Sequence, residues 1–247
     1  MPITVPFISR VPESVAILGM GRSIATYVHM IAQAGNVRAV YDQVWAINAA
    51  AAPLRADLIF HMDDIEIQER RAANGANPHI AGLLATLAGD EGPLVVTSRW
   101  HKNYPRTRAY PLQDVLREVR YAYFNSTAAY ALALAIAIGV KRIGLFGCDF
   151  SYPNAHRAET GRGCVEFWIG MAMARGVAIQ VAGDSTLLDA CVPERERFYG
   201  YDTVDVAVSQ GPDGPTVTLT PREEKDIPSA EEIERRYRGV VSSAGGR

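Results

Sequence analysis

Short apolar runs that alternate with helix-like segments constrain the fold of this chain more than any other feature. The first run, VAILGMG at 15–21, ends in two glycines, and 23–35 then carries apolar residues at helical spacing before a Gly stop. Further strand-like runs lie at 43–50, 56–64 and 93–100. Strands that alternate with helices form a mainly parallel sheet with helices on its faces. The pattern therefore predicts a doubly wound α/β fold.

The second half of the chain continues this alternation. NSTAAYALALAIAIG at 125–139 predicts a long buried helix, because Asn, Ser or Thr supplies its start signal. The run KRIGLFGCDF at 141–150 is apolar on both faces, as strands at the centre of a parallel sheet are. A further strand is predicted at 177–183, and further helices at 67–89 (interrupted by NGANP), 111–119, 162–176 and 184–191.

A hairpin and a charged tail are predicted at the end of the chain. VDVAVSQ at 204–210 and TVTLT at 216–220 flank GPDGP, which is typical of a β-hairpin. The charged segment that follows predicts a surface helix at 229–238 and a frayed terminus. We therefore expect one main domain at 1–192 and a C-terminal hairpin with a partly flexible tail at 193–247.

The net charge and the cysteine content argue against several classes of protein. A net charge of −2 gives no basic field of the kind that binds nucleic acid tightly. Three cysteines without CxxC spacing argue against a disulfide framework or a structural zinc site. The most apolar stretch, 128–140, is too short to span a bilayer, and the first residues lack the pattern of a signal peptide. We expect a cytoplasmic protein that does not associate with a membrane.

Polar groups gather just after the predicted strands, where ligands bind in an open parallel sheet. Five of the six strand ends carry a charged group, and the second carries an amide. The turn at 19–23 can cradle a phosphate, because glycines let backbone N–H groups approach an anion at a helix N-terminus. It matches neither GxGxxG nor a Walker A loop, so a plain tight turn is the equal alternative. The residues that we single out in these positions are Gly19, Gly21, Arg22, Ser23, Asn48, Asp63, Asp64, Asp149, Tyr152 and His156.

Two of these strand ends have a structural alternative to a binding role. Asn48 either contacts a base or ribose edge or caps the segment that follows it. Asp63 and Asp64 either hold Mg²⁺ on phosphates or begin a helix, since IEIQERR follows. A helix cap uses one of the two carboxylates and leaves the other free.

The loop GCDFSYPNAHRAETGRGCVEFW at 147–168 holds the foremost catalytic candidate, His156. An imidazole titrates near neutral pH, which suits a general acid or base. No HxxxH, HExxH or GxSxG spacing exists, which argues against a catalytic zinc and a serine hydrolase. We expect Asp149 to fix the loop, and Tyr152 and His156 to face the ligand.

The run from NSTAAYALALAIAIG through GLFGCDFSY to His156 and CVEFW resembles bacterial sialyltransferases of the lipooligosaccharide type. It is also similar to the 6-hydroxymethylpterin diphosphokinase-like family, and both have a Rossmann-like core. The resemblance covers roughly 15–190 and is most specific at 125–168. It implies transfer from a CMP-sugar without a required metal, His156 as general base, and frequent self-association. The donor-site positions that it implies are Asn48, Ser126, Thr127 and the GxDF motif with Asp149.

Two departures from the sialyltransferase pattern leave the function open at this point. Met20 stands where those enzymes carry an Asn between the two glycines, and Asp63 and Asp64 replace an uncharged strand end. The carboxylates favour the diphosphokinase-like relatives, which transfer pyrophosphate from ATP and need Mg²⁺. We prefer a glycosyltransferase that uses a nucleotide-activated sugar, over a Mg²⁺-dependent pyrophosphokinase or a non-catalytic nucleotide-binding module. A basic and aromatic segment around Trp100 either contacts an anionic acceptor or is a solvated loop.

Overall fold

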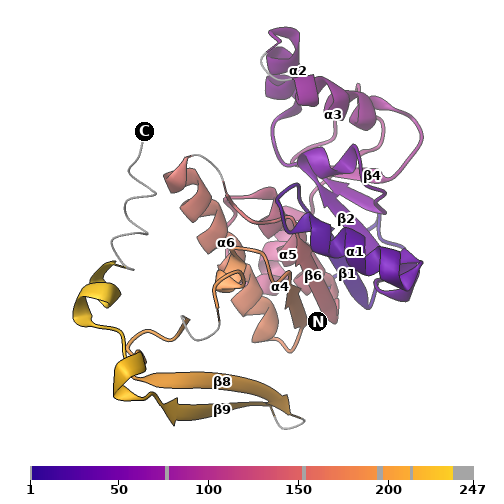
Figure 1. Cartoon of the computed structure of the whole chain (residues 1–247). Helices are drawn as coiled ribbons and strands as arrows, with labels where there is room; N and C mark the ends of the chain where they lie inside the picture. Colours follow the sequence, from indigo (N-terminus) through magenta and orange to yellow (C-terminus); the bar gives the residue numbers. More distant parts are fainter. Residues whose placement is uncertain (1, 76–77, 152–153, 194–196, 212–213, 236–247) are drawn as a thin grey trace. The chain divides into compact units, whose positions relative to one another are not determined.

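The computed structural model describes residues 2–75, 78–151, 154–193, 197–211 and 214–235 of the chain. A seven-stranded sheet forms its centre, with the strand order β5-β4-β3-β2-β1-β6-β7 (Figure 1). All six neighbouring pairs in this sheet are parallel. The strands are β1 Ser14–Leu18, β2 Gln43–Ile47, β3 Leu58–Phe60, β4 Leu94–Thr97, β5 Thr107–Ala109, β6 Arg142–Phe146 and β7 Ala178–Val181.

Helices cover both faces of the sheet, which confirms the predicted Rossmann-like α/β fold. Residues of β1 alternate between the two faces, as the period of a strand requires. Val15 and Ile17 pack with α5 on one face, whereas Ala16 and Leu18 pack with Tyr27 of α1 on the other. The helices are α1 Ile24–Ala34, α2 Ile65–Ala73, α3 Pro78–Ala88, α4 Leu112–Val119, α5 Thr127–Ile138 and α6 Ala155–Met173.

The helix α5 lies in the middle of the larger core. Every residue of α5 except Tyr130 is buried, and the helix packs on β1, β2 and β3 as well as on α4 and α6. Small alanines let these neighbours approach closely. The helix ends at Gly139, whose φ of 90° lies in the left-handed region that glycine adopts at little cost. At the other end of the helix, Thr127 Oγ1 lies 3.4 Å from Nδ2 of Asn48, so the N-terminus of α5 lies at the carboxyl end of β2.

Several predicted elements need correction. The helix expected from residue 162 begins at Ala155, because the Asn154 side chain accepts a hydrogen bond from Arg157 N at 2.9 Å and caps it. The third strand is limited to β3, and the second ends at Ile47, where Asn48–Ala51 form a 3-10 turn (η2). The strand β5 was not predicted. Instead of a helix at 184–191, the structure has a short 3-10 turn, Leu187–Asp189 (η3).

The chain divides into two compact units, Met1–Leu188 and Asp189–Arg247. The second unit contains the predicted hairpin, in which β8 Val204–Gly211 pairs antiparallel with β9 Gly214–Pro221. Residues 230–235 are helical, within the range expected for a surface helix. No helix in the described part of the chain is long and apolar enough to cross a membrane.

Candidate functional site

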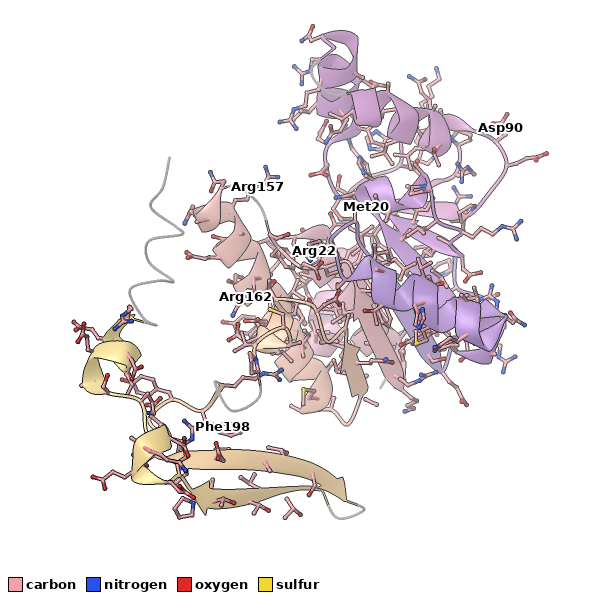
Figure 2. The ribbon with its side chains drawn as sticks, in the orientation of Figure 1. Met20, Arg22, Asp90, Arg157, Arg162 and Phe198 are labelled. Carbon is pink, nitrogen blue, oxygen red and sulfur yellow. The ribbon has the colours of Figure 1, made fainter. Side chains whose placement is uncertain are left out.

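A cavity of about 420 Å³ opens at the carboxyl ends of β1, β2 and β6, beside the N-terminus of α5. This is the edge at which parallel sheets of this kind bind ligands. Met20, labelled in Figure 2, forms part of its rim and is 57 % exposed. The described lining consists of Gly19, Met20, Gly21, Ile47, Asn48, Ala49, Ser126, Thr127, Ala128, Gly147, Cys148, Asp149, Phe150 and Ser151.

The turns after β1 and β6 interlock at the bottom of this cavity. Gly19 N donates to Phe146 O at 2.8 Å, and Gly21 N donates to Gly147 O at 2.7 Å. A Cβ atom at Gly19 would collide with the carbonyl of Gly147, and Gly147 itself has a φ of 68°. The glycines after β1 are therefore required by the contact between two backbones, whatever they do for a ligand.

Asp149 lines the cavity, but both of its carboxylate oxygens are bonded to the first turn. Its Oδ2 accepts a hydrogen bond from Ser23 N at 2.7 Å, and its Oδ1 accepts one from Ser23 Oγ. Ser23 Oγ in turn accepts a hydrogen bond from Gly147 N at 2.8 Å. Both residues are buried. The carboxylate of Asp149 thus occupies the N-terminus of α1, the position where the sequence led us to expect a phosphate.

This arrangement changes the role expected of the turn at 19–23. The N–H groups of Gly19, Gly21 and Ser23 all have protein acceptors. Those of Met20 and Arg22 have no acceptor within the described residues, and the Arg22 side chain is exposed. The turn therefore has two free backbone N–H groups and the Arg22 guanidinium available to bind an anion.

The N-terminus of α5 is open to the cavity. The Oγ of Ser126 accepts a hydrogen bond from Ala129 N at 3.3 Å and caps the helix. The N–H groups of Thr127 and Ala128 have no acceptor within the described residues, and the first turn contains no acidic side chain. A helix N-terminus with free donors and positive partial charge favours an anion. Ser126, Thr127 and Ala128 all line the cavity.

Asn48 joins the end of β2 to α5. Its Nδ2 lies 3.4 Å from Thr127 Oγ1, and its backbone φ is 49°. Asn tolerates this left-handed conformation better than most residues, so the turn partly explains its presence. Asn48 is only half-buried and lines the cavity, so its amide is placed to reach a ligand.

Phe150 and Cys148 complete the wall next to α6. The Phe150 ring packs so closely on Gly161 that a Cβ there would lie 2.6 Å from Phe150 Cε1. Burial raises the pKa of the Cys148 thiol to about 12. A thiol that stays protonated at neutral pH is a poor nucleophile, so Cys148 serves as packing. Phe150 is the last residue of the GxDF motif that the family resemblance singled out, and it lines the cavity.

Of the two catalytic candidates in the 147–168 segment, the structure describes His156. His156 is exposed in the first turn of α6, and its carbonyl accepts a hydrogen bond from Thr160 Oγ1 at 2.8 Å. It is not among the described lining residues, whereas Ser151, five positions before it, is. Tyr152 lies outside the described residues. In Figure 2, Met20 and Arg22 lie across from the part of α6 that carries Arg157.

The carboxylates after β3 have different surroundings. Asp64 caps α2, because its Oδ1 accepts a hydrogen bond from Ile67 N at 3.0 Å; this bond is the main reason that its pKa is lowered. Arg99 lies 4.0 Å from the second oxygen of Asp64. Asp63 is exposed and makes no hydrogen bond or ion pair in the described part of the chain. No group of three or more His, Cys, Asp or Glu side chains within the described residues could hold a metal ion.

His61 directly follows β3 and belongs to the polar groups that the sequence places at the strand ends. The ring is fully buried, and neither of its nitrogens has a hydrogen-bond partner in the described structure. Burial lowers the pKa of His61, and the nearby His101 lowers it further, while Asp63 raises it. The apolar run LIF before it indicates that His61 is buried, because a residue next to a buried strand shares the surroundings of that strand.

Comparison with known proteins finds similarity only at the level of solved structures. No family model matches the chain, and no curated protein matches it. The sialyltransferase CstII from Campylobacter jejuni, in complex with the substrate analogue CMP-3FNeuAc, aligns with a TM-score of 0.44 and 15 % identity. That alignment covers 92 % of this chain and 99 % of CstII.

Two further sialyltransferase structures from the same organism give comparable values. The α-2,3-sialyltransferase in apo form has a TM-score of 0.43 and 14 % identity, over 98 % of this chain and 100 % of its own. The monofunctional Cst-I has a TM-score of 0.43 and 14 % identity, over 99 % of both chains. Similarity at this level concerns the arrangement of the chain, so the function is inferred from the site itself.

Proposed function

We propose that the protein is a glycosyltransferase that uses a nucleotide-activated sugar and binds the donor in the cavity at Asn48 and Ser126. One observation carries this proposal: the N-terminus of α5 is open to the cavity, whereas that of α1 is occupied by Asp149. A phosphate or carboxylate of the donor would lie against the N–H groups of Thr127 and Ala128. Met20 lines the same cavity and offers a further free N–H group.

The remaining lining suits the uncharged parts of such a donor. The cavity volume is in the range of small-molecule sites. Asn48 offers an amide that both donates and accepts, and Thr127 offers a hydroxyl, which fits the edge of a base or the hydroxyls of a sugar. Phe150 and Met20 offer apolar surface against which a flat ring packs.

The transfer step requires one proton acceptor beside this cavity. In the proposed reaction, the acceptor hydroxyl oxygen forms a bond to the anomeric carbon as the bond from that carbon to the phosphate oxygen breaks. The hydroxyl proton passes to His156, and the leaving phosphate keeps the electron pair. We assign His156 as the general base and Tyr152 as the residue that donates a hydrogen bond to the leaving phosphate. Both assignments rest on sequence position, because the two residues follow the lining residue Ser151 within five positions.

The chemistry of the lining favours this reaction over pyrophosphate transfer. A Mg²⁺-dependent pyrophosphokinase needs free carboxylates beside the phosphates. Asp149 is the one carboxylate in the described lining, and both of its oxygens are bonded to Ser23. Asp64 caps α2. The site has backbone donors where a kinase would need acidic ligands.

Thermal unfolding with CMP, UDP, ADP and ATP, each with Mg²⁺ or with EDTA, tests the proposal. A nucleotide bound at about 100 times its Kd stabilises the fold by about 2.7 kcal/mol, which is easily seen as a higher midpoint. We expect stabilisation by CMP or UDP that EDTA does not remove. Stabilisation by ATP alone, abolished by EDTA, would support the pyrophosphokinase, and no shift with any nucleotide would refute both enzymes.

The role of His156 needs its own variant. His156→Ala should keep the nucleotide-induced shift and lose transfer, which is followed by mass spectrometry of a nucleotide-sugar that stabilises the protein. His29→Ala is the matched control, because His29 is also exposed on a helix and its ring lies 2.9 Å from Gln33 Nε2. Equal activity in both variants would remove His156 from the mechanism.

A further inference from the structure

We propose that a second cavity is an effector site for a small oxyanion that carries an apolar group. It lies at the opposite edge of the sheet from the cavity at Asn48 and Ser126, which we term the donor cavity. The inference goes beyond the proposed function, because it concerns a separate site. Three features carry it: an apolar floor, a buried arginine that contacts no carboxylate within the described residues, and a segment of chain that lines both cavities.

The second cavity has a volume of about 540 Å³, within the range of small-molecule sites. Its lining includes Asp57, Pro93 and Arg106, which directly precede β3, β4 and β5. Since these strands are parallel, their amino ends share one edge of the sheet, opposite to the edge at which the donor cavity opens. In Figure 2, Asp90, in the segment between α3 and β4, lies well apart from Met20 on the rim of the donor cavity. We term this space the amino-edge cavity, and a ligand in it would not touch the donor.

The floor of the amino-edge cavity is apolar. Ala51 and Ile59 are buried there, and Leu54 and Ala56 pack against the same hydrophobic cluster while they stay partly exposed. A ligand group that covers Leu54 and Ala56 removes apolar surface from water, which favours binding. The floor therefore suits an aromatic or aliphatic group better than a fully hydrated ion.

The guanidinium of Arg106 gives this cavity a buried positive charge. Arg106 is 6 % exposed and donates hydrogen bonds to the backbone carbonyls of Thr86, Gly89 and Pro93. Burial lowers the pKa of Arg106 and Asp90 raises it, although no ion pair joins the two in the described structure. A guanidinium has five N–H donors, so donors remain after these three bonds. A buried charge without a contacting counter-ion is costly, and an oxyanion in the cavity would supply that counter-ion.

The charges at the rim favour an anion over a cation. Arg38 and Asp57 neutralise each other, because the guanidinium donates to both carboxylate oxygens, at 2.9 and 2.5 Å. Arg55 and Glu91 are exposed, and neither makes a hydrogen bond or an ion pair within the described residues. Two cations, Arg55 and Arg106, therefore share the lining with one carboxylate, that of Glu91. The excess positive charge and the forked guanidinium groups suit a carboxylate or a phosphate ester.

A short segment of chain lines both cavities. Asn48 and Ala49, at the start of η2, line the donor cavity, whereas Ala51 and Leu54 line the amino-edge cavity. Leu54 N donates to Ala50 O at 3.2 Å, which ties the end of this segment to the turn. A ligand held against Ala51 and Leu54 therefore acts on Asn48, the residue that we assign to donor binding. This connection makes the second cavity an effector site rather than an isolated one.

Titration of the ¹⁵N-labelled full chain with 2-naphthoate and with 2-naphthyl phosphate, followed by amide chemical shifts, tests the inference. Each probe joins an apolar ring system to one oxyanion, and the pair distinguishes a carboxylate ligand from a phosphate ligand. We expect saturable shifts at the amides of 54–57, accompanied by shifts at Asn48 and Ala49. The neutral 2-naphthalenemethanol and the cationic 2-naphthylmethylamine should bind at least about tenfold more weakly, because they cannot accept charge-assisted hydrogen bonds from arginine.

Two variants should change the affinity for these probes in opposite directions. Arg55→Gln removes a cation and should weaken binding about fivefold, whereas Glu91→Gln removes the carboxylate and should tighten it about twofold. Both side chains are exposed, so neither change should affect folding. Arg117→Gln is the matched control, because Arg117 is an exposed arginine of α4, which packs with α5 on the other face of the sheet.

Several results would overturn the inference. Absence of saturable binding, or equal affinity in wild type, Arg55→Gln and Glu91→Gln, would remove the anion site. Shifts at 126–128 in place of 54–57, or displacement of the probe by a nucleotide that stabilises the protein, would put the probe in the donor cavity. Shifts at 54–57 that do not reach Asn48 and Ala49 would refute the effector role. Failure of every nucleotide to bind would refute the proposed function alone, because this titration needs no nucleotide.

Discussion

The carboxylate of Asp149 accepts two hydrogen bonds from Ser23, a residue 126 positions earlier in the chain. The contact joins the turn after β1 to the turn after β6, and it supplies the negative charge at the N-terminus of α1. It also determines what the neighbouring cavity can bind, because the open helix N-terminus there belongs to α5.

Removal of Asp149 should destabilise the fold. Asp149→Ala leaves the buried Ser23 N–H without an acceptor, and such an orphaned donor costs about 1–3 kcal/mol. Urea denaturation of the two proteins measures this difference. Asp184→Ala is the control, because its bond from Thr26 Oγ1 at 3.1 Å is exposed and should contribute within about 0.5 kcal/mol. Equal losses of unfolding free energy in the two variants would show that the buried Asp149–Ser23 bonds stabilise the fold no more than the exposed bond does.

A carboxylate placed at the start of α5 should block the donor. Asp is as good a helix cap as Ser, so Ser126→Asp should fold normally. Its charge competes for the proposed anion position, and we expect affinity for the stabilising nucleotide to fall by about tenfold or more, equivalent to 1.4 kcal/mol. Isothermal titration measures it.

The companion variant Ser126→Ala separates charge from capping. It removes the cap and should lower stability by about 1 kcal/mol, with a smaller effect on affinity. Wild-type affinity in Ser126→Asp would mean that the phosphate lies elsewhere, for example at Met20 and Arg22.

Two glycines should respond in opposite directions to alanine. At Gly19, the new Cβ would collide with the Gly147 carbonyl, a backbone atom that cannot move aside, and we expect a loss of about 1–3 kcal/mol. At Gly163 in α6, a Cβ would meet nothing within 4 Å, and alanine should stabilise the helix by about 0.5–1 kcal/mol. Thermal midpoints of both variants provide the measurement. A stable Gly19→Ala would mean that the two turns do not interlock.

His61 should make stability depend on pH. Burial lowers its pKa in the folded state, so the unfolded chain, with a His pKa of about 6.5, binds the proton more readily. Stability is then complete above about pH 6.5 and is lost as the pH falls toward the folded pKa, by at most about 1.4 kcal/mol per pH unit. Asp63, which raises this pKa, limits the effect.

The variant His61→Leu tests this dependence. It removes two buried nitrogens that lack partners, so we expect a stability near that of wild type at pH 8 and a higher one at pH 5.5. Urea midpoints between pH 5 and pH 8 provide the curve. If the two proteins gave parallel curves, the pKa of His61 would be the same in the folded and unfolded states.

Local patterns in the chain were sufficient for the fold class. The alternation of apolar runs and helical periodicity predicted the parallel sheet, and Ser126 and the NST start signal predicted α5, because both depend on neighbours in sequence. Element ends were less certain. The start of α6 at Ala155 depends on the cap by Asn154, and the strand β5 gains its place only by pairing with β4.

The candidate site could also be predicted only in part from the sequence. The residues at the ends of the predicted strands included Gly19, Asn48 and Asp149, and the family resemblance added Ser126 and Thr127. All five line one cavity. The sequence did not reveal the packing of the Phe150 ring on Gly161 or the exposure of Trp100. It also could not separate Asp63 from Asp64, because a cap and a free carboxylate have the same residue type.

The sequence by itself determined the alternation of strands and helices and the edge of the sheet at which polar groups collect. The tertiary structure alone decided which of those groups remain available to a ligand. A hydrogen bond such as that between Asp149 and Ser23 depends on the approach of two turns far apart in the chain, and no local pattern encodes that approach. The same contact closes the N-terminus of α1 and leaves that of α5 open to the cavity.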